Sequence, residues 1–570
     1  MATYSVPAEA QKLLENEIIN NKLHSFIPSE TREAYTHIEF QGTDFPSIPV
    51  NWRFAESMAA LRGFEGAMLN ILLNKKYGIP YQKIVINTDH ASLLFMEFMY
   101  SEIIEQDGKR IMAHHPEFSQ KYFPNLVKSP AFYTPLGQKC TNIYKTKDGR
   151  FIHTHASLDP VPTMKALDID PNLQLPTGTN PCSIFSEKIA FHNASDLDKL
   201  LNDQHRQAAT VCLSTEEFLC SPHGKANAHV GLYEIHHVSN PNQKPCWWKA
   251  VEGKTTPTRP LYGLKVIDLT RIIAAPTIGR TLAEQGASLL RITSRNLPDF
   301  AELNFELGWG KWNAHLDLKN QEDRERLKEL ILESDVVISG YRPGVMDKWG
   351  FGKEDVMKMC EGRERGIIYV RENCYGWNGP LTYRSGWQQI SDAICGVSLE
   401  FGRSMGLEEP VAPIFPNADY STGVIGATSV LQALIERSRK GGSYIIDLAL
   451  NYYSQWLINS VKPYPPDVWH QLWTMYGKPM FRHDDNMPVT LVKVCKMLAE
   501  NERSREALFK EEFWEVRENE ALGKGVRVKA LRPALRFPEG LVKPGFQVGT
   551  RPNGRDKPRW PEDLDTVVIE

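Results

Sequence analysis

The second half of the sequence predicts a doubly wound α/β fold built on a parallel sheet. From residue 261 onward, strand-length apolar segments alternate with helix-length amphipathic segments. The apolar segments are short and almost uniformly hydrophobic, which is typical of parallel strands that helices cover on both faces. Ligands of such sheets bind at the carboxyl ends of the strands, so that edge is the expected place for a site.

The elements of this region follow in order. Leu264–Leu269 is the first expected strand, and the helix Thr277–Gln285 ends at Gly286. Further strands are expected at Ser288–Ile292, Val336–Ser339, Ile367–Arg371 and Tyr444–Leu450, with helices at Glu322–Glu333 and Glu354–Cys360.

The segment Ile414–Ser454 predicts one long buried helix followed by the last strand. Its turn residues Pro416–Ala418 place Asp419 at the expected N-cap of that helix. Gly423 and Gly426 allow the first turns of the helix to approach another backbone closely. The positive end of the helix stabilises a carboxylate as the anion, which makes Asp419 available as a nucleophile. From the residues alone, capping is the commoner role for such an aspartate.

The first half is less regular. Arg53–Lys76 predicts a long helix and Lys83–Asn87 a strand, and Lys147-Asp148-Gly149 marks the turn of a hairpin. Other helices are expected near Asp196–Asp203, Thr215–Leu219 and Val489–Asn501, and Asn240–Arg259 reads as a linker. His153 and His155 alternate on one strand, and ordinary hydrogen-bonded histidines are expected there rather than a metal site.

Composition excludes several classes of protein. The net charge of −3 favours neither nucleic acid nor a membrane surface, and we expect neither as a partner. The nine cysteines are scattered without C-x-x-C spacing, which indicates a reducing compartment. The start of the chain lacks the pattern of a signal peptide, so the cytoplasm is the expected location. The first βα turn, Leu269–Pro276, lacks G-x-G-x-x-G, which makes a nicotinamide enzyme improbable.

Residues 261–455 resemble the class III CoA-transferase family, the CaiB/BaiF group that includes formyl-CoA transferase and α-methylacyl-CoA racemase. The matching blocks are LYGLKVIDLTRIIAAPTIGRTLAEQGASLLRI, NAHLDLKN, SDVVISGYRPGVMDKWGFG, NCYGWNGPLTYRSGWQQISDAICGVS and PNADYSTGVIGATSVLQALIERSRKGGSYIIDLAL. The resemblance implies a Rossmann-like large domain with a smaller α+β domain.

The resemblance also implies a site. The family's catalytic aspartate falls on Asp419, which would form an aspartyl–acyl anhydride while CoA moves between two carboxylic acids. Coenzyme A or its thioester is then a substrate, the other partner is a small carboxylic acid, and no covalent cofactor is implied. The implied CoA contacts are Ile273, Ala274, Leu316–Lys319, Gly340, Tyr341, Arg342, Lys348 and Arg384, with either Ser294 or Arg295 on the adenine side.

Two departures leave the reaction open. Trp387 stands where racemases of the family carry a histidine, which disfavours two-base proton transfer. The glycine-rich loop of oxalate-using transferases is also not visible. The leading expectation is therefore a CoA-transferase, with a racemase or a non-catalytic CoA-binding protein of the same fold as alternatives.

The first half resembles a degenerate copy of the same family. Residues 50–235 match its back part, and the catalytic position falls near Glu56-Ser57. Asp159 lies roughly where relatives place a second carboxylate, although a loop aspartate before proline is an equally good interpretation. The expected divisions are a degenerate half at 1–239, a linker at 240–260, a large domain at 261–460 and an extension at 461–570 packed on it. The chain would form a pseudo-dimer by itself, and whether it self-associates further stays open.

Overall fold

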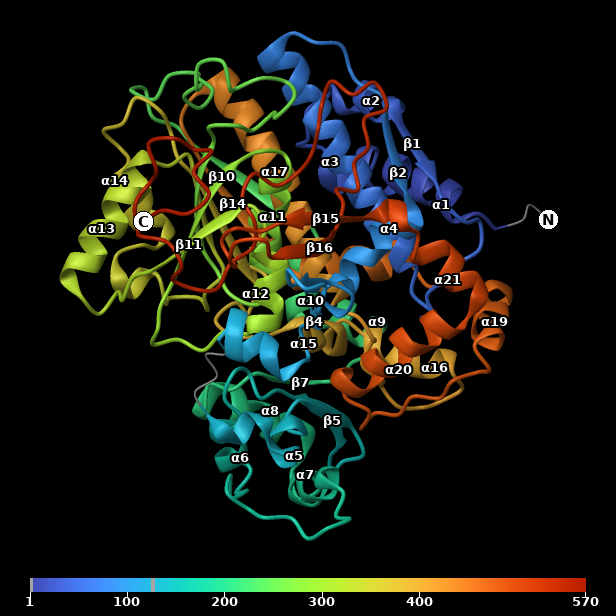
Figure 1. The fold of residues 1–570 in the computed structure, drawn as a ribbon. Coiled ribbons are helices and arrows are strands. Elements are labelled where there is room, and N and C mark those ends of the chain that lie inside the picture. Colours follow the sequence, from blue (N-terminus) through green and yellow to red (C-terminus); the bar gives the residue numbers. More distant parts are fainter. Residues whose placement is uncertain (1–3, 125–128) are drawn as a thin grey trace.

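The structure is a computed structural model that describes residues 4–124 and 129–570. Within those residues its largest sheet has seven strands, in the order β11-β10-β9-β12-β13-β14-β8 (Figure 1). The strands are β8 (Glu234–Val238), β9 (Lys265–Leu269), β10 (Ser288–Thr293), β11 (Lys311–His315), β12 (Val336–Ser339), β13 (Ile368–Asn373) and β14 (Ser443–Ala449). Strands β9 to β14 are parallel, whereas β8 is antiparallel to β14.

Helices cover both faces of this sheet, as the sequence predicted. The helices of this part of the chain are α11 (Ala274–Glu284), α12 (Ala301–Leu307), α13 (Gln321–Glu333), α14 (Lys353–Met359), α15 (Gln388–Ile394), α16 (Val397–Ser404), α17 (Asn417–Lys440) and α18 (Leu450–Trp456). Successive strand residues face different cores: Val266 packs with α11 and α17, and Ile267 packs with α13 and α14. This alternation is the pleat of a strand buried on both sides.

The N-terminal region contributes a parallel pair of strands joined by a long helix. Strand β1 (Ile38–Gln41) pairs with β2 (Ile84–Asn87), and α3 (Phe54–Tyr77) connects them. The other helices here are α1 (Val6–Lys12), α2 (Thr31–Ala34) and α4 (Thr88–Ser92). Strand β8, at the end of this half, completes the large sheet by pairing with β14. The predicted domain boundary at residue 239 therefore lies just after β8, a strand that is part of the large sheet of the second half.

A small domain lies below the large sheet in Figure 1. Its sheet has the order β5-β6-β7, formed by Asn142–Lys145, Phe151–Thr154 and Ala209–Val211, all antiparallel. The helices are α5 (Pro135–Gln138), α6 (Val161–Ala166), α7 (Pro181–Ile189), α8 (Ala194–Lys199), α9 (Thr215–Cys220) and α10 (Pro222–Asn227). The hairpin turn forms where it was predicted, with Gly149 in the left-handed region at φ 77°.

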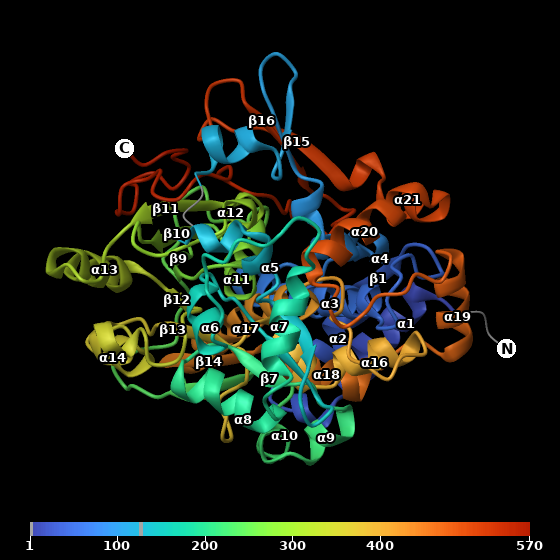
Figure 2. The ribbon, with the colours of Figure 1, turned by 90° about the horizontal axis from the view of Figure 1, so that it is seen from below.

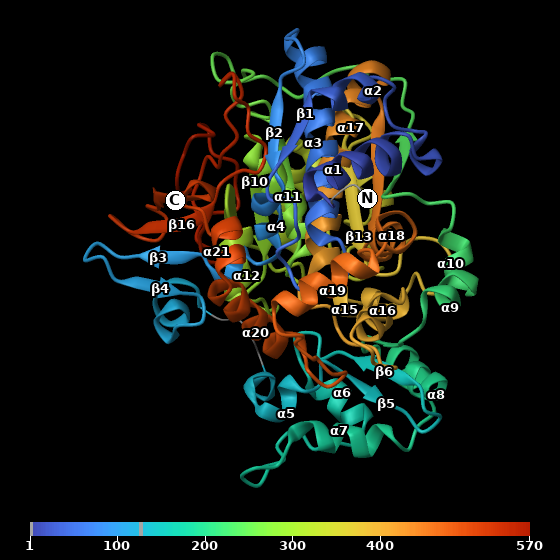
Figure 3. The same cartoon turned by 90° about the vertical axis from the view of Figure 1, so that its right-hand side faces the viewer.

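The C-terminal segment returns across both halves. Its strands β15 (Trp514–Glu518) and β16 (Arg527–Leu531) form a sheet with β3 (Glu102–Ile104) and β4 (Arg110–Met112) (Figure 3). Its helices are α19 (Pro466–Met475), α20 (Met487–Glu500) and α21 (Glu502–Leu508). Seen from below, α19 lies near the N-terminus, opposite α13 and α14 (Figure 2). In the described residues, no helix combines the length and hydropathy that a membrane crossing needs.

Helix α17 packs between α11 and α3, and its early glycines set the distance to α11. A Cβ on Gly423 would lie 2.3 Å from the Cβ of Thr277 and 2.8 Å from the Ala274 carbonyl. A Cβ on Gly426 would lie 2.7 Å from Ile278. These separations are shorter than any real Cβ contact, so only glycine permits this approach. The predicted close contact of the first turns of α17 therefore occurs with α11.

The predicted N-cap of α17 is wrong by three residues. The helix begins at Asn417 with Pro416 as the cap, and Asp419 is its third residue. The amide of Asn417 bonds to the carbonyl of Phe415 at 2.7 Å, which tightens the chain and starts the helix earlier. Within the described residues the Asp419 side chain makes no capping hydrogen bond to α17.

A buried cluster of charged side chains joins α3 to α11 and α12. Arg62 contacts Glu65 at 2.7 Å and Glu284 at 3.6 Å. Arg280 contacts Glu97 at 2.5 Å and Glu284 at 3.8 Å. The hydroxyl of Tyr420, next to Asp419, donates to Glu306 at 2.6 Å. Burial raises the pKa of Glu65 to about 7 and that of Glu306 to about 8, with neighbouring carboxylates adding to both.

We expect Gly423→Ala to destabilise the protein by about 1–3 kcal/mol, because the new methyl group must push α17 away from α11. Chemical denaturation measures this, and Gly362→Ala is the matched control because nothing lies within 4 Å of the Cβ added there. A loss no larger than the control's would contradict the close-packing argument.

The buried cluster also predicts how stability depends on pH. Glu65 and Glu306 have folded-state pKa values above the ordinary 4.5, so the folded chain binds more protons than the unfolded chain between those values. The stability that these two groups contribute is therefore greatest below pH 4.5. It falls as the pH rises from there through 7 and 8, by up to about 1.4 kcal/mol per pH unit for each group.

Glu306→Gln should flatten this decline in thermal-denaturation scans from pH 5 to 9. The exposed Glu539→Gln is the control and should leave the slope unchanged. Equal slopes for wild type and Glu306→Gln would show that Glu306 is ionised in the folded protein.

Candidate active site

Asp419 lies in the first turn of α17, partly exposed to a cavity of about 490 Å³. Burial of its surroundings raises the pKa of Asp419 to about 7. Within the described residues no hydrogen-bond donor is within reach of its carboxylate, which leaves both oxygens free to face the cavity. A desolvated and unpartnered carboxylate at a helix N-terminus is a reactive arrangement.

A second carboxylate, Glu372, lines the same cavity from the carboxyl end of β13. Burial, and then the charge of Asp419, raise the pKa of Glu372 to about 8. The sequence analysis did not single out Glu372, because it ended the strand at Arg371. The general rule that sites gather at the ends of parallel strands would have found it.

Two further acidic groups lie nearby without being candidates for the chemistry. Asp392 on α15 is fully buried and accepts a hydrogen bond from Gln388. Burial and the charge of Asp419 raise the pKa of Asp392 well above its ordinary value. Cys374 lines the cavity, but burial raises the pKa of its thiol well above 9.0, so it stays a poor nucleophile.

The cavity is enclosed by both halves of the chain. The small domain contributes Ser157, Leu158, Asp159, Pro162 and Gln207, and the large domain contributes the remaining walls. The Ser157 hydroxyl accepts hydrogen bonds from Arg342 and from the Trp387 indole, each at 3.2 Å. One chain therefore supplies both sides of one cleft, as the pseudo-dimer interpretation requires.

The first βα turn forms one wall and carries backbone strain. Ile272 has φ 73°, a left-handed conformation that is very unfavourable for a β-branched residue. Arg271, Ile272, Ile273 and Ala274 all line the cavity at the start of α11. Such strain costs of the order of 1–3 kcal/mol and persists only where surrounding contacts impose it.

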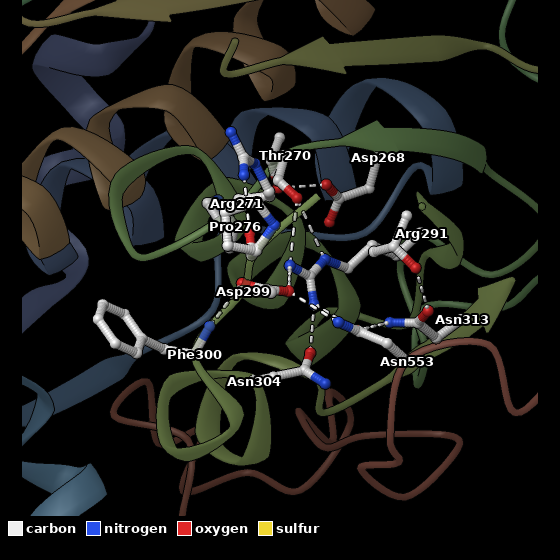
Figure 4. Close-up of polar contacts among 12 residues, drawn as sticks. Asp268, Thr270, Arg271, Pro276, Arg291, Asp299, Phe300, Asn304, Asn313 and Asn553 are labelled. Carbon is white, nitrogen blue, oxygen red and sulfur yellow. Dashed lines mark hydrogen bonds and ion pairs between the residues drawn. The ribbon is translucent and has the colours of Figure 1, made fainter. Parts of the chain in front are cut away.

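The contacts that impose this turn centre on Arg291 of β10 (Figure 4). Its guanidinium donates to the Thr270 carbonyl at 3.2 and 3.3 Å, to Asp299 at 2.9 Å, and to the Asn304 side chain. Arg271 in turn donates to the Pro298 carbonyl at 2.7 Å. The loop before α12 and the turn before α11 are thereby held together beside the cavity.

A smaller apolar cavity of about 130 Å³ adjoins the first. It lies over the carboxyl ends of β9, β10 and β11, and both cavities are lined by Leu297, Tyr341, Val345 and Trp349. The two spaces form one path that ends at Asp419. Arg271, Arg342 and Arg384 stand along the larger cavity, and Lys319 along the smaller one.

The structure distributes the predicted CoA contacts along this path. The larger cavity is lined by Ile273, Ala274, Gly340, Tyr341, Arg342 and Arg384. The smaller one is lined by Ser294, Leu316, Lys319 and again Tyr341. Arg295 and Lys348 line neither cavity, although the Lys348 ammonium lies 5.1 Å from the ring centre of Trp349. Sequence analysis missed Arg271, which lines the larger cavity.

Arg384 has a second role in the structure. It bonds to Asp198 at 2.8 Å and to Asp203 at 3.5 Å, which ties the large domain to the small one. Its charge is therefore already balanced by two carboxylates. The exposed Asp159 is on the cavity wall, where its carboxylate accepts a bond from the Val161 amide at 3.1 Å.

Trp387 closes the cavity on the side of the small domain. Its ring stacks on His155 with centroids 5.0 Å apart and an interplanar angle of 4°. The Nδ1 atom of His155 accepts a hydrogen bond from the Ser157 amide at 2.9 Å, and burial lowers the pKa of His155 well below 6.5. His153 bonds to the Thr154 carbonyl at 2.7 Å. Both histidines are thus neutral and hydrogen-bonded.

A possible metal cluster lies elsewhere on the sheet, at Glu234, His236 and Asp447. Arg371 binds both oxygens of Asp447, at 2.6 and 2.8 Å, so that carboxylate already has its countercharge. The arrangement fits a structural ion pair better than a metal site.

Comparison with known proteins places this geometry in a family. A model of CoA-transferase family III matches residues 261–463. Acetyl-coenzyme A transferase nodX of Hypoxylon pulicicidum is 44% identical over 570 residues, covering 100% of this chain and 95% of that protein. An acyl-CoA transferase of Gibberella moniliformis is 29% identical, with 84% and 83% covered.

A solved mutant structure of Rv3272 from Mycobacterium tuberculosis is also similar, at 19% identity and a TM-score of 0.38, covering 53% of this chain and 98% of that chain. That score is too low to support the fold, which stands on the sheet order and the helices described above. The full-length match at 44% identity is decisive for the family. The chain belongs to CoA-transferase family III and is an enzyme of the CoA-transferase class.

Proposed function

We propose that the protein moves CoA from an acyl-CoA to a carboxylic acid through an aspartyl–acyl anhydride on Asp419. The observation that carries this proposal is the unpartnered Asp419 carboxylate, which faces a cavity lined by both halves of the chain. In the first step Asp419 attacks the thioester carbonyl, the C–O bond forms, and the C–S bond breaks to release CoA thiolate. The incoming carboxylate then attacks the acyl carbon of this anhydride, which frees Asp419 and leaves a mixed anhydride of the two acids. The CoA thiolate attacks the carbonyl carbon of the second acid, the new C–S bond forms, and the first acid leaves as its carboxylate.

The path through the two cavities suits a CoA thioester. The small apolar cavity beside Leu316 and Trp349 can hold the adenine, and the arginines of the larger one can pair with phosphates. The free N–H groups at the start of α11 add a positive helix end on the same wall. The pantetheine arm would then run past Tyr341 toward Asp419.

Acetyl-CoA is the first acyl donor to test. The full-length relative nodX is named an acetyl-coenzyme A transferase, which makes acetyl-CoA a reasonable donor for this chain as well. Trp387, held in place by stacking on His155, lines the same cavity as Asp419 and limits its width, which favours a short acyl group. The acceptor acid is best found by screening mono- and dicarboxylic acids.

A racemase remains the second candidate because of Glu372. Two carboxylates facing one cavity could remove and return an α-proton without the histidine that Trp387 replaces. Deuterium incorporation at the α-carbon of a branched acyl-CoA, without exchange of CoA between acids, would favour this reaction over transfer.

Asp419→Asn and Asp419→Ala should lower CoA exchange by at least about a thousandfold, since the covalent route is lost. Mass spectrometry of new CoA esters measures exchange, with Glu539→Gln as an active control. Hydroxylamine added during turnover should convert the anhydride to a hydroxamate on the Asp419 peptide, whereas the Glu56 peptide should stay unmodified. Exchange that survives in Asp419→Ala would refute the proposal.

Arg342→Ala should raise KM for acetyl-CoA about tenfold with little change in kcat, because one charge-assisted bond to a phosphate is lost. S-acetylpantetheine lacks the adenosine phosphates, so its KM should not change. Arg505→Ala, an exposed arginine on α21, is the matched control. A parallel rise in KM for both thioesters would mean that Arg342 only shapes the cleft.

A further inference from the structure

Glu372 is a carboxylate of the candidate cavity for which the proposed reaction gives no role. It is placed rigidly, because the Asn373 side chain bonds to both the amide and the carbonyl of Gly376 at 2.7 and 2.9 Å. The carbonyl of Cys374 is held by the Asn451 amide at 2.9 Å. A fixed strand end thus presents Glu372 to the cavity beside Asp419.

The groups around Glu372 leave its carboxyl without a countercharge. On β14 it pairs in register with Leu448, and the preceding Arg371 is bound by Asp447. The nearest charge is Asp419 on α17. From the other elements, α15 brings Asp392, which Gln388 binds. The cavity walls carry Cys374, Asp159 and the arginines Arg271, Arg342 and Arg384.

Each of those arginines has another contact. Arg271 donates to Pro298, Arg342 to Ser157 and the Arg206 carbonyl, and Arg384 to Asp198. Among the described residues none of them is an ion-pair partner of Glu372. Two carboxylates that face one partly dry cavity resist being ionised together, so one of them keeps its proton.

We infer that Glu372 acts as a neutral carboxylic acid that donates a hydrogen bond to the acyl oxygen while Asp419 attacks as the anion. This inference rests on the proposed function and adds a second catalytic residue to it. When the Asp419 oxygen bonds to the thioester carbon, the carbonyl electron pair moves to oxygen, and the Glu372 O–H stabilises that oxyanion. The pair returns as the C–S bond breaks, CoA leaves as thiolate, and Glu372 keeps its proton throughout.

The assignment of Asp419 as the anion and Glu372 as the neutral acid agrees with the surroundings of each carboxyl group. The pKa of Asp419 is raised to about 7 and that of Glu372 to about 8, so near neutral pH Asp419 ionises first. The charge that forms on Asp419 then holds the proton on Glu372 more tightly. The active form, with Asp419 ionised and Glu372 protonated, is therefore most populated between the two apparent pKa values of the pair. As a result, kcat/KM should rise and then fall as the pH increases.

The test is the pH profile of kcat/KM for CoA exchange in wild type, Glu372→Gln and Glu372→Ala. The amide of Glu372→Gln still donates a hydrogen bond but cannot ionise, so it should keep activity within about tenfold and lose the alkaline decline. Glu372→Ala should lose about a hundredfold or more at every pH, as removal of an oxyanion donor does. Circular dichroism and thermal unfolding check that both variants fold.

A second measurement needs no activity. The infrared carbonyl stretch of a protonated carboxyl, taken as the difference between wild type and Glu372→Gln, should titrate near pH 8. In Asp419→Asn the same band should titrate at lower pH, because the neighbouring charge is gone. Glu539→Gln gives the baseline difference for an exposed carboxylate.

Any of three results would overturn the inference while leaving the proposed function intact. Two of them are an alkaline decline that persists unchanged in Glu372→Gln and a Glu372 band already absent at pH 7. Loss of all exchange in Glu372→Gln would also overturn it, since that shows a need for the anion. Failure of the proposed function appears differently, as wild-type exchange that does not depend on Asp419.

Discussion

The close contact between α17 and α11 is the constraint on which the site depends. Gly423 and Gly426 let α17 lie against Thr277 and Ile278 with no side chain between them. Because Asp419 is one turn before Gly423, this contact fixes its carboxylate beside the strained turn at Ile272. On the other side α3 packs against α17, so the helix is buried along nearly its whole length. The end of the helix that carries Asp419 can therefore move little relative to the cavity walls.

The strands and helices that sequence alone predicted are those whose positions follow from the local pattern of apolar and turn residues. The strands from Lys265 to Ala449 appear within about two residues of their predicted bounds, because uniformly apolar runs between turn residues leave few alternatives. Strand β11 was missed, since Lys311 and Asn313 break its apolar pattern. Their side chains are buried by partners distant in the chain: the Lys311 ammonium donates to Asp268 at 2.8 Å, and the Asn313 side-chain amide donates to Asn553 at 2.8 Å.

Sequence alone predicted only those residues of the candidate site that the resemblance to the family aligns. Asp419, Tyr341 and Arg342 come from ordered sequence blocks, and the structure brings them to one cleft. The small-domain wall could not be placed from sequence, because its position beside Asp419 depends on how two distant parts of the chain pack. The same holds for β8, which leaves the first half to pair with β14. Contacts of this kind have no local signature in the residues.

The two long helices explain why one chain has one candidate site. Both α3 and α17 have 24 residues, and each carries a carboxylate as its third residue: Glu56 in α3 and Asp419 in α17. Glu56 accepts hydrogen bonds from Tyr4 at 2.6 Å and from Tyr464 at 3.0 Å, and its side chain is fully buried. A buried carboxylate engaged by two hydroxyls is a poor nucleophile, so of these two carboxylates only Asp419, which lines a cavity, is a candidate for the chemistry.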